Sequence, residues 1–276
     1  MTGSRELSRG PPRRPRHRWP VCLLALLSWS AAAAELDFVW EDAFDAAERA
    51  RLEGWIRETQ AAVERLVGPF PMPVTVHLHR RASDREPVPW AHTRRWRGQA
   101  VHFHVDTRHP PEAFRRDWTA PHELSHLILP YLGRRAAWFA EGFASYMQYQ
   151  VMIAMGVLDE AEAGERYRAR IGRASARYPY PRLSFVEAAP RLREDRLYPV
   201  MYWGGATYFL RVDQALRREG SSLPAVLRRY LACCRRDRQT LDALLGELDR
   251  LAPAPVFTGQ YRRLAGERGF PALPDD

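Results

Sequence analysis

Two short stretches near the middle of the chain decide its fold: Thr119-Ala-Pro-His-Glu-Leu-Ser-His126 and Trp138-Phe-Ala-Glu-Gly-Phe-Ala-Ser-Tyr146. The first stretch contains the pattern H-E-x-x-H, in which His122 and His126 are four residues apart. Residues with this spacing lie on one face of an α-helix, about one turn apart, so their two imidazoles can bind a single metal ion. The alternative is a surface helix that carries two unrelated histidines.

The acidic residue of this pattern, Glu123, has the position of a general base. Neighbouring residues of an α-helix are rotated by about 100°, so Glu123 can face a reacting water without becoming a ligand. A structural zinc site usually has four protein ligands and has no use for a base. The pattern therefore predicts a hydrolytic site with one zinc ion.

A hydrolytic zinc site needs a third protein ligand. The metzincin solution requires Gly and His after the second histidine, where this chain has Leu129 and Leu132. The other common solution is a Glu on the following helix, and Glu141 lies in an apolar helical stretch where a lone carboxylate needs a partner. We therefore predict Glu141 as the third ligand. The alternative is a carboxylate that faces solvent or an arginine.

The chain as a whole is expected to fold as an α+β protein. A helical pattern at 41–67 precedes two alternating stretches, 74–78 and 101–105, which predict strands of a small antiparallel sheet with one buried face. The segment between them, about 80–98, is expected to be a loop or an irregular strand. From residue 111 onward the pattern is almost wholly helical, and the expected helices cover residues 119–130, 136–155, 160–176, 184–192, 200–219, 223–235, 240–250 and 258–268.

Residues 1–34 have the features of a signal peptide: clustered arginines, a short apolar run at 21–29 and a row of alanines before Glu35. We therefore expect a periplasmic or secreted protein, with an uncleaved anchor or a misplaced start as the alternatives. No other stretch has the ~20 apolar residues needed to span a bilayer, so no stable membrane insertion is expected after cleavage. The remaining chain is expected to form one catalytic unit from a helix-and-sheet subdomain, 35–115, and a helical subdomain with the zinc site, 116–276.

Charge and cysteine content limit which partners, disulfides and metal sites are expected. The net charge is +9, but residues 1–34 contribute +5 of it, so the rest of the chain is only mildly basic and nucleic acid is not an expected partner. Of three cysteines, Cys22 lies in the signal segment, while Cys233 and Cys234 are adjacent in a predicted helix, where a disulfide is strained. We expect no disulfide framework, strain argues against a bond within this pair, and a cysteine-based metal site is unsupported. Nothing in the sequence indicates an oligomeric state.

The combination of H-E-x-x-H and W-x-x-E-G-F-A-S-Y resembles the gluzincin metallopeptidases, with the nearest likeness to the glycyl and alanyl aminopeptidase families. The stretch 202–206, Tyr-Trp-Gly-Gly-Ala, resembles the Y-x-K-G-A segment of those families. The resemblance implies that His122, His126 and Glu141 bind zinc and that Glu123 is the general base. It also implies that Tyr202 donates a hydrogen bond to the oxyanion; a core tyrosine is the alternative, and Tyr198 competes for the role.

The chain departs from these families in three places. Only 14 residues separate His126 from Glu141, fewer than is usual, and Gly204 replaces the Lys of Y-x-K-G-A. The alanyl aminopeptidases bind the substrate amine through the Glu of G-A-M-E-N, whereas the segment nearest in position, 98–101, reads Gly-Gln-Ala-Val. We therefore expect an endopeptidase rather than an aminopeptidase, with a peptide or protein substrate that adds alongside the strand at 101–105.

Two other functions stay open. One is a zinc-binding but non-catalytic protein of the cell envelope, and the other is a basic protein that binds nucleic acid or a membrane surface. Two H-x-H pairs, at 77–79 and 102–104, lie on the polar sides of the predicted strands. We expect them to be solvent-facing residues of the sheet, with a second metal site or a place in the cleft as the alternatives.

Overall fold

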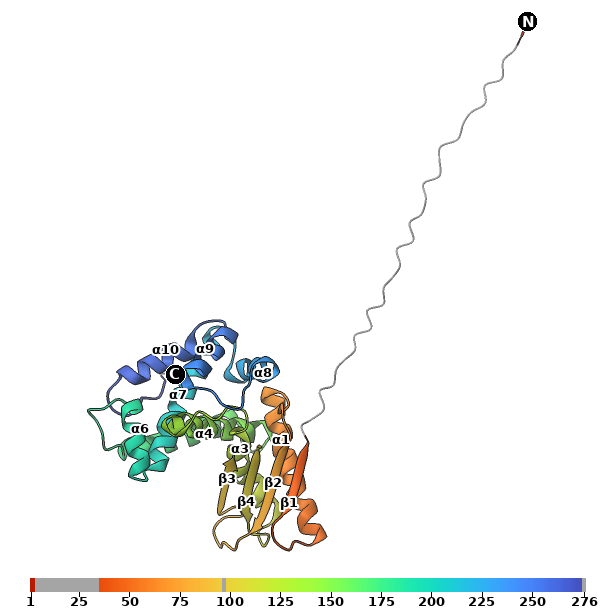
Figure 1. Ribbon diagram of the computed structural model, residues 1–276, viewed down its shortest axis with the longest axis vertical. Helices are drawn as coiled ribbons and strands as arrows, with labels where there is room; N and C mark the ends of the chain where they lie inside the picture. Colours follow the sequence, from red (N-terminus) through yellow and green to blue (C-terminus); the bar gives the residue numbers. More distant parts are fainter. Residues whose placement is uncertain (3–34, 96–97, 275–276) are drawn as a thin grey trace. The chain divides into compact units, whose positions relative to one another are not determined.

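The computed structural model describes residues 1–2, 35–95 and 98–274, so the predicted signal segment lies outside the described residues apart from its first two. Four strands form one sheet in the order β1-β2-β4-β3 (Figure 1). They are β1 (Leu36–Trp40), β2 (Val74–Arg80), β3 (Trp90–Arg94) and β4 (Ala100–Val105). The expected α+β class is confirmed, and the segment expected to be irregular contains β3.

The expected strand direction is wrong. β2 pairs with β4 in parallel, with Val76 opposite Val101, and β1 also pairs with β2 in parallel. The antiparallel pair is β3 with β4. Because β3 lies between β2 and β4 in the chain but on the outer side of β4 in the sheet, it returns the chain so that β4 runs in the direction of β2. The alternation of side chains predicts which face is buried, not which way a strand runs.

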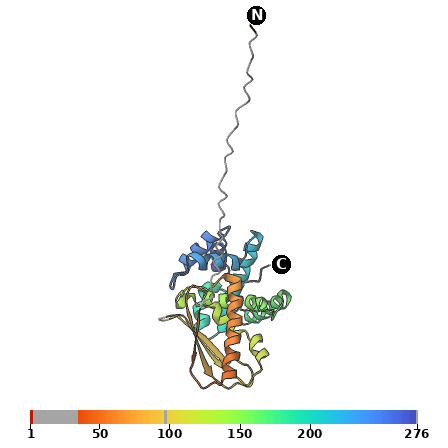
Figure 2. The same ribbon diagram turned by 90° about the vertical axis from the view of Figure 1, so that its right-hand side faces the viewer.

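One face of the sheet packs against α1 (Ala46–Val67), as Figure 2 shows. The helix begins with a capping box, in which Asp45 and Glu48 accept each other's backbone N–H groups. Its buried Trp55 packs edge-on against Phe103 of β4, with 5.3 Å between ring centroids. The helix ends at Val67, and the capping residue Gly68 follows with a φ of 88° that favours glycine. The buried residues of α1 and of this face belong to the hydrophobic core.

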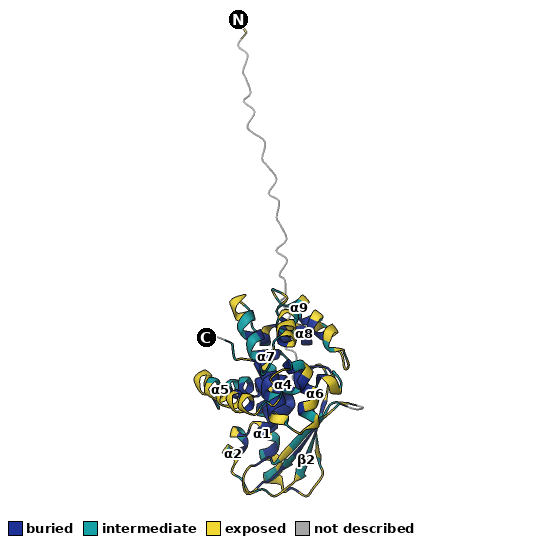
Figure 3. Cartoon of the chain, turned by 90° about the vertical axis from the view of Figure 1, so that its left-hand side faces the viewer, coloured by how far each residue is buried: buried dark blue, intermediate teal, exposed yellow. Residues whose placement is uncertain are grey.

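The rest of the described chain is helical, as expected. Figure 3 shows the buried α4 at the centre of these helices, with the more exposed α5 at the outside. The helices are α2 (Pro111–Arg116), α3 (Thr119–Ser125), the 3-10 turn η1 (Arg134–Ala136), α4 (Ala137–Ala154), α5 (Glu160–Ala176), α6 (Phe185–Glu194), α7 (Tyr198–Arg218), α8 (Leu223–Cys233), α9 (Leu241–Leu251) and α10 (Val256–Gly266). No described helix is long and apolar enough to cross a bilayer.

Two glycines set the distance between α4 and α7. A Cβ atom on Gly142 would lie 2.3 Å from the backbone carbonyl carbon of Gly205, and one on Gly205 would lie 2.2 Å from the carbonyl oxygen of Trp138. Ordinary carbon contacts are ~3.5 Å or longer. The two helices therefore touch backbone to backbone, which brings the residues next to these glycines close together.

The expectation for the cysteines is wrong, because Cys233 and Cys234 form a disulfide. The helix predicted to continue to residue 235 ends at Cys233, and Cys234 follows it as the capping residue with φ −138° and ψ −2°. The pair thus straddles a helix end rather than lying inside a helix. The argument from helical geometry fails for this reason.

Candidate metal centre

The three predicted zinc ligands come together in the structure. α3 carries His122, the residue after its end is His126, and the second turn of α4 carries Glu141. One carboxylate oxygen of Glu141 lies 3.3 Å from Nε2 of His122 and 3.4 Å from Nε2 of His126. Tetrahedral ligands with bonds of 2.0–2.1 Å to zinc are ~3.3–3.4 Å apart. The donor set and its spacing therefore fit one zinc ion.

The carboxylate of the triad is held in its charged form. Burial alone would raise the pKa of Glu141, but the charge of His126 and the hydrogen bonds with both histidines lower that pKa well below its usual range. The side chain keeps 26% of its surface exposed, while those of His122 and His126 keep 4% and 8%. A metal ligand must be deprotonated, and this carboxylate meets that condition at neutral pH.

Gln148 of α4, which was not predicted, contacts the predicted ligand His122. Its Oε1 lies 3.1 Å from Nδ1 of the buried His122. A proton on Nδ1 leaves the lone pair of Nε2 for a metal, and such partners fix the ring of metal-binding histidines. Gln148 lies seven residues after Glu141, two turns along α4, so a helical projection from Glu141 is the signal that could have found it.

The end of α3 is held by Arg95, another residue that the sequence analysis did not single out. Its guanidinium donates hydrogen bonds to the carbonyl oxygens of His126 and of Pro130, the latter at 3.0 Å. Burial is the main cause that lowers the pKa of Arg95, to about 10. The guanidinium remains charged at neutral pH and fixes the turn in which the second histidine lies.

The predicted base, Glu123, points to the same cleft as the triad and is 8% exposed. Thr93 of β3 donates its hydroxyl hydrogen bond toward Oε2 of Glu123 at 2.8 Å, and its Oγ1 also lies 3.1 Å from the backbone oxygen of Glu123. A tertiary contact between residues 30 positions apart leaves no local pattern in the sequence, so Thr93 was not predicted.

Tyr202 of α7 lines this cleft, with its ring centroid 6.2 Å from that of His122. Burial, followed by the charges of Glu141 and Glu123, raises the pKa of Tyr202 well above its usual value, so the phenol keeps its proton. The competing Tyr198 is 42% exposed and lines a neighbouring cavity instead. Position and protonation agree with the predicted role of Tyr202 as a hydrogen-bond donor, which stays a prediction.

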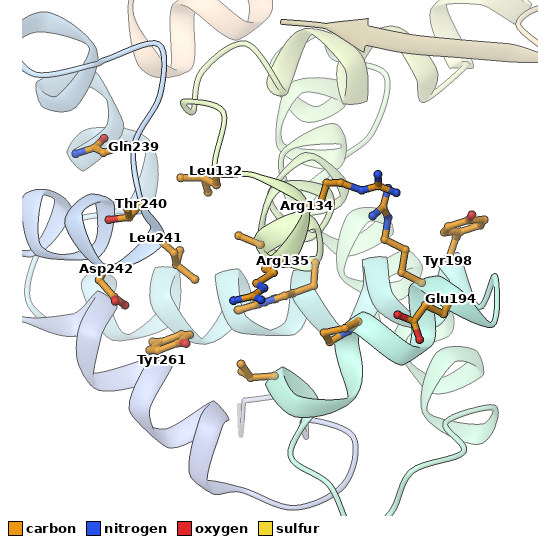
Figure 4. A pocket seen from close by; sticks show the side chains of 15 residues that line it. Leu132, Arg134, Arg135, Glu194, Tyr198, Gln239, Thr240, Leu241, Asp242 and Tyr261 are labelled. Atoms are coloured by element: carbon orange, nitrogen blue, oxygen red, sulfur yellow. The ribbon is translucent and has the colours of Figure 1, made fainter.

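The cleft has a volume of about 600 Å³, and β3 forms one of its walls. Residues 88–93 and Arg95 line it, whereas residues 98–101 do not. β4 has neighbours on both sides, so the expectation that a peptide adds along 101–105 is wrong. The edge strands of the sheet are β1 and β3, and β3 is the one that lines the cleft. A second cavity of about 1110 Å³ shares Leu132, Arg134 and Arg193 with the cleft (Figure 4).

The arrangement of elements is shared with solved structures of M1 zinc metallopeptidases. The chain is similar to the M1 zinc metallopeptidase from Deinococcus radiodurans, with a TM-score of 0.55 and 17% identity over 88% of this chain and 50% of that one. The fold is that of the M1 zinc metallopeptidases. A mutant of the same protein bound to a Tyr-Ser-Ala substrate matches with a TM-score of 0.55 and 18% identity, again over 88% and 50% of the two chains.

An aminopeptidase N family protein from Idiomarina loihiensis matches with a TM-score of 0.60 and 14% identity, over 87% of this chain and 46% of that one. The chain thus spans about half the length of these M1 structures. No protein-family model matches the sequence, and no curated protein sequence matches it. The predicted resemblance to gluzincin aminopeptidases is confirmed at the level of the fold, together with the His-His-Glu arrangement.

Proposed function

We propose that this chain is a zinc-dependent hydrolase of peptide bonds. The observation that carries the proposal is the arrangement of His122, His126 and Glu141 around one point, at the wall of a cleft that also contains Glu123. Three protein ligands leave a coordination position open, which distinguishes a catalytic zinc site from a structural one. The M1-like fold supports a peptide substrate.

The chemistry that a zinc ion supplies in such a site is Lewis acidity, which activates water and polarises a carbonyl group. Glu123 accepts a proton from the attacking water and delivers it to the leaving amine. Thr93 holds the carboxylate of Glu123 in place through its hydroxyl group. Tyr202 donates a hydrogen bond to the oxygen on which negative charge develops, a contribution often worth a few kcal/mol.

The free edge of β3 gives the substrate a binding mode. An extended peptide can pair with Trp90–Arg94 as an additional strand, since backbone hydrogen bonds give affinity whatever the side chains. This strand forms a wall of the cleft and carries Thr93 beside Glu123. Strand addition therefore places a substrate carbonyl near the base without any sequence-specific pocket.

Within this proposal we place endopeptidase cleavage ahead of the removal of amino-terminal residues. To bind the free amine of a substrate, an aminopeptidase needs a carboxylate other than the zinc ligand Glu141 and the base Glu123. Among the described residues of the cleft, Glu86 is the one acid besides Glu123 and Glu141, and it is exposed. Removal of amino-terminal residues is the alternative to internal cleavage, because M1 structures contain a Tyr-Ser-Ala peptide or the amino acids L-tryptophan and L-arginine.

The test is digestion of a mixed peptide pool by the full chain and by Glu123→Gln, with bound metal measured in both. We expect zinc at the His122–His126–Glu141 triad and the same zinc content in both proteins, internal cuts by the wild type and at least a thousandfold slower turnover by the variant. Wild-type turnover in Glu123→Gln would refute the mechanism. Zinc without turnover in the wild type would favour the non-catalytic envelope protein instead.

Cut positions separate the two kinds of peptidase, and Glu86→Gln is the matched variant. An endopeptidase keeps its rate in this variant and also cuts peptides with acetylated amino ends. An aminopeptidase that binds the amine through Glu86 loses its activity in this variant, and it does not cut peptides with acetylated amino ends. Either result leaves the zinc-hydrolase proposal intact.

We also propose that residues 1–34 direct export to the periplasm or the exterior. The support is the arginine-rich start, the apolar run and the alanines before Glu35. Cell fractionation and amino-terminal sequencing of the protein made by its own host test this. The expected mature chain begins at or near Glu35, and an intact protein in the cytosol would overturn the proposal.

A further inference from the structure

Five histidines cover the face of the sheet opposite α1. They come from three neighbouring strands, and strand pairing puts them in two rows. His77 of β2 is opposite His102 of β4, which is opposite His92 of β3; His79 is opposite His104, which is opposite Trp90. Figure 1 shows no described helix drawn over this face of the strands. We call this set the histidine grid: His77, His79, His92, His102 and His104.

The imidazoles of the grid stack on one another. Ring centroids are 4.1 Å apart for His77 and His102, 4.7 Å for His92 and His102, and 4.4 Å for His79 and His104. The interplanar angles of these pairs are between 6° and 10°. Side chains opposite each other in a sheet are close enough to bind one ligand together. The grid therefore brings neighbouring imidazoles into direct contact.

Two nitrogens of the grid form a hydrogen bond whose length is close to the separation of two ligands on one metal ion. Nε2 of His79 lies 3.0 Å from Nδ1 of His102. Two imidazoles with bonds of ~2.0–2.1 Å to one ion have nitrogens ~2.9 Å apart in a square-planar site and ~3.4 Å apart in a tetrahedral one. The observed separation lies between these values. His77 and His104, whose rings stack on those of His102 and His79, are the imidazoles from which a third nitrogen would come.

The central histidine has a second nitrogen, on the other side of its ring from the Nδ1 that faces His79, that lacks a partner. His102 is 7% exposed, and its buried Nε2 has no hydrogen-bond partner among the described residues. A buried polar atom without a partner costs about 1–3 kcal/mol, so such positions commonly bind something. Nδ1 of His92 is buried and unpartnered in the same way.

A carboxylate supports the outer histidine. Oε1 of Glu41 lies 2.6 Å from Nδ1 of His77, which leaves Nε2 of that ring for another partner. Carboxylates in this position orient metal-binding histidines and raise their basicity. Burial also lowers the pKa of His102, to about 4, and lowers the pKa values of His92 and His104. These three rings are therefore neutral at pH 7, the form that binds metal.

We propose that the histidine grid is a second metal site, which binds one Cu2+, Ni2+ or Zn2+ ion through His79, His102 and a neighbouring imidazole. Imidazole suits all three ions, and Cu2+ is expected to bind most tightly. The site is distinct from His122, His126 and Glu141, with which it shares no ligand. The proposal does not depend on peptidase activity.

The test counts metal ions in the full chain after chelation and reloading with Ni2+ or Zn2+. We expect two equivalents in the wild type and one in His126→Ala, which disables the triad. Adding His79→Asn to His126→Ala should remove the remaining equivalent or weaken its binding at least tenfold. His109→Asn is the matched control, because His109 is the one described histidine outside both sets, and it should leave the count unchanged.

A second measurement covers the case in which His79→Asn fails to fold. The paramagnetic resonance spectrum of His126→Ala loaded with Cu2+ should show coupling to two or more nitrogens at one equivalent. One equivalent in the wild type and none in His126→Ala would overturn the proposal. Loss of binding in His109→Asn, or a copper spectrum without nitrogen coupling, would overturn it as well.

Discussion

Replacing Gly142 by Ala tests the backbone contact between α4 and α7. The new methyl carbon would lie 2.3 Å from the carbonyl carbon and 2.5 Å from the Cα atom of Gly205. Carbon atoms prefer ~3.5 Å or more, so the helices must separate by roughly 1 Å. Overpacking of this kind costs about 1–3 kcal/mol, and the upper end applies here because both partners are backbone.

The higher helix propensity of Ala offsets about 1 kcal/mol of this cost, which leaves a net loss of ~2 kcal/mol in the free energy of unfolding. For a chain of this size the melting temperature should fall by about 4–8 °C. The positions of two site residues should shift as well, since Glu141 precedes Gly142 and Tyr202 lies one turn before Gly205. A displacement of ~1 Å in an active site can cost about 100-fold in rate.

The assays are thermal unfolding followed by circular dichroism and kcat/KM on a peptide identified from the pool. The control is Gly172→Ala on α5, where a Cβ atom meets nothing within 4 Å. That exposed substitution should stabilise the chain by about 0.5–1 kcal/mol. If Gly142→Ala proves as stable and as active as Gly172→Ala, the close approach of α4 and α7 does not exist in the protein.

Three further predictions concern the site and its support. Tyr202→Phe should keep its zinc but lose about 100- to 1000-fold in kcat, as expected for an oxyanion donor, and an unchanged kcat would make Tyr202 a core residue. Gln148→Ala should weaken zinc binding about 10- to 100-fold in competition with a chelator, while equal affinity would remove its orienting role. Burial raises the pKa of Asp117 from 3.8 to about 6, so its favourable contribution is complete below pH 3.8 and is lost as the pH rises through 6. The stability of the wild type relative to Asp117→Asn, measured by urea unfolding, should therefore fall by up to about 3 kcal/mol between pH 4 and 7, and a constant difference would contradict the burial of this carboxyl.

The zinc ligands were predictable because each had a local signature. His122 and His126 repeat at the period of a helix, and Glu141 interrupts an apolar stretch. The short separation from His126 to Glu141 has a simple structural basis. α3 ends at Ser125 instead of continuing to residue 130, so the turn toward α4 starts at once and few residues are needed to bring Glu141 back.

The residues that support the ligands were harder to predict, because their contacts are tertiary. Thr93 contacts Glu123 across the junction of sheet and helix, and Arg95 caps the turn after His126 from the same segment. That segment was expected to be a loop or an irregular strand. The direction of β4 was missed for a related reason, since it depends on where β3 lies in the sheet. Periodicity reports burial, whereas pairing partners depend on the whole chain.

The turn between the zinc-binding helices is tied to the far end of the sequence. Tyr131 exchanges backbone hydrogen bonds with Asp237 and Gln239, at 2.9 and 3.4 Å, and Arg235 donates to the carbonyl oxygen of Leu127 at 3.2 Å. A truncated chain that stops before residue 235 would retain all three predicted ligands but lose the hydrogen bonds that hold the turn connecting them. The smallest fragment able to retain its ion is therefore far longer than the motif, and grafting 119–146 onto another scaffold would transfer the ligands without their spacing.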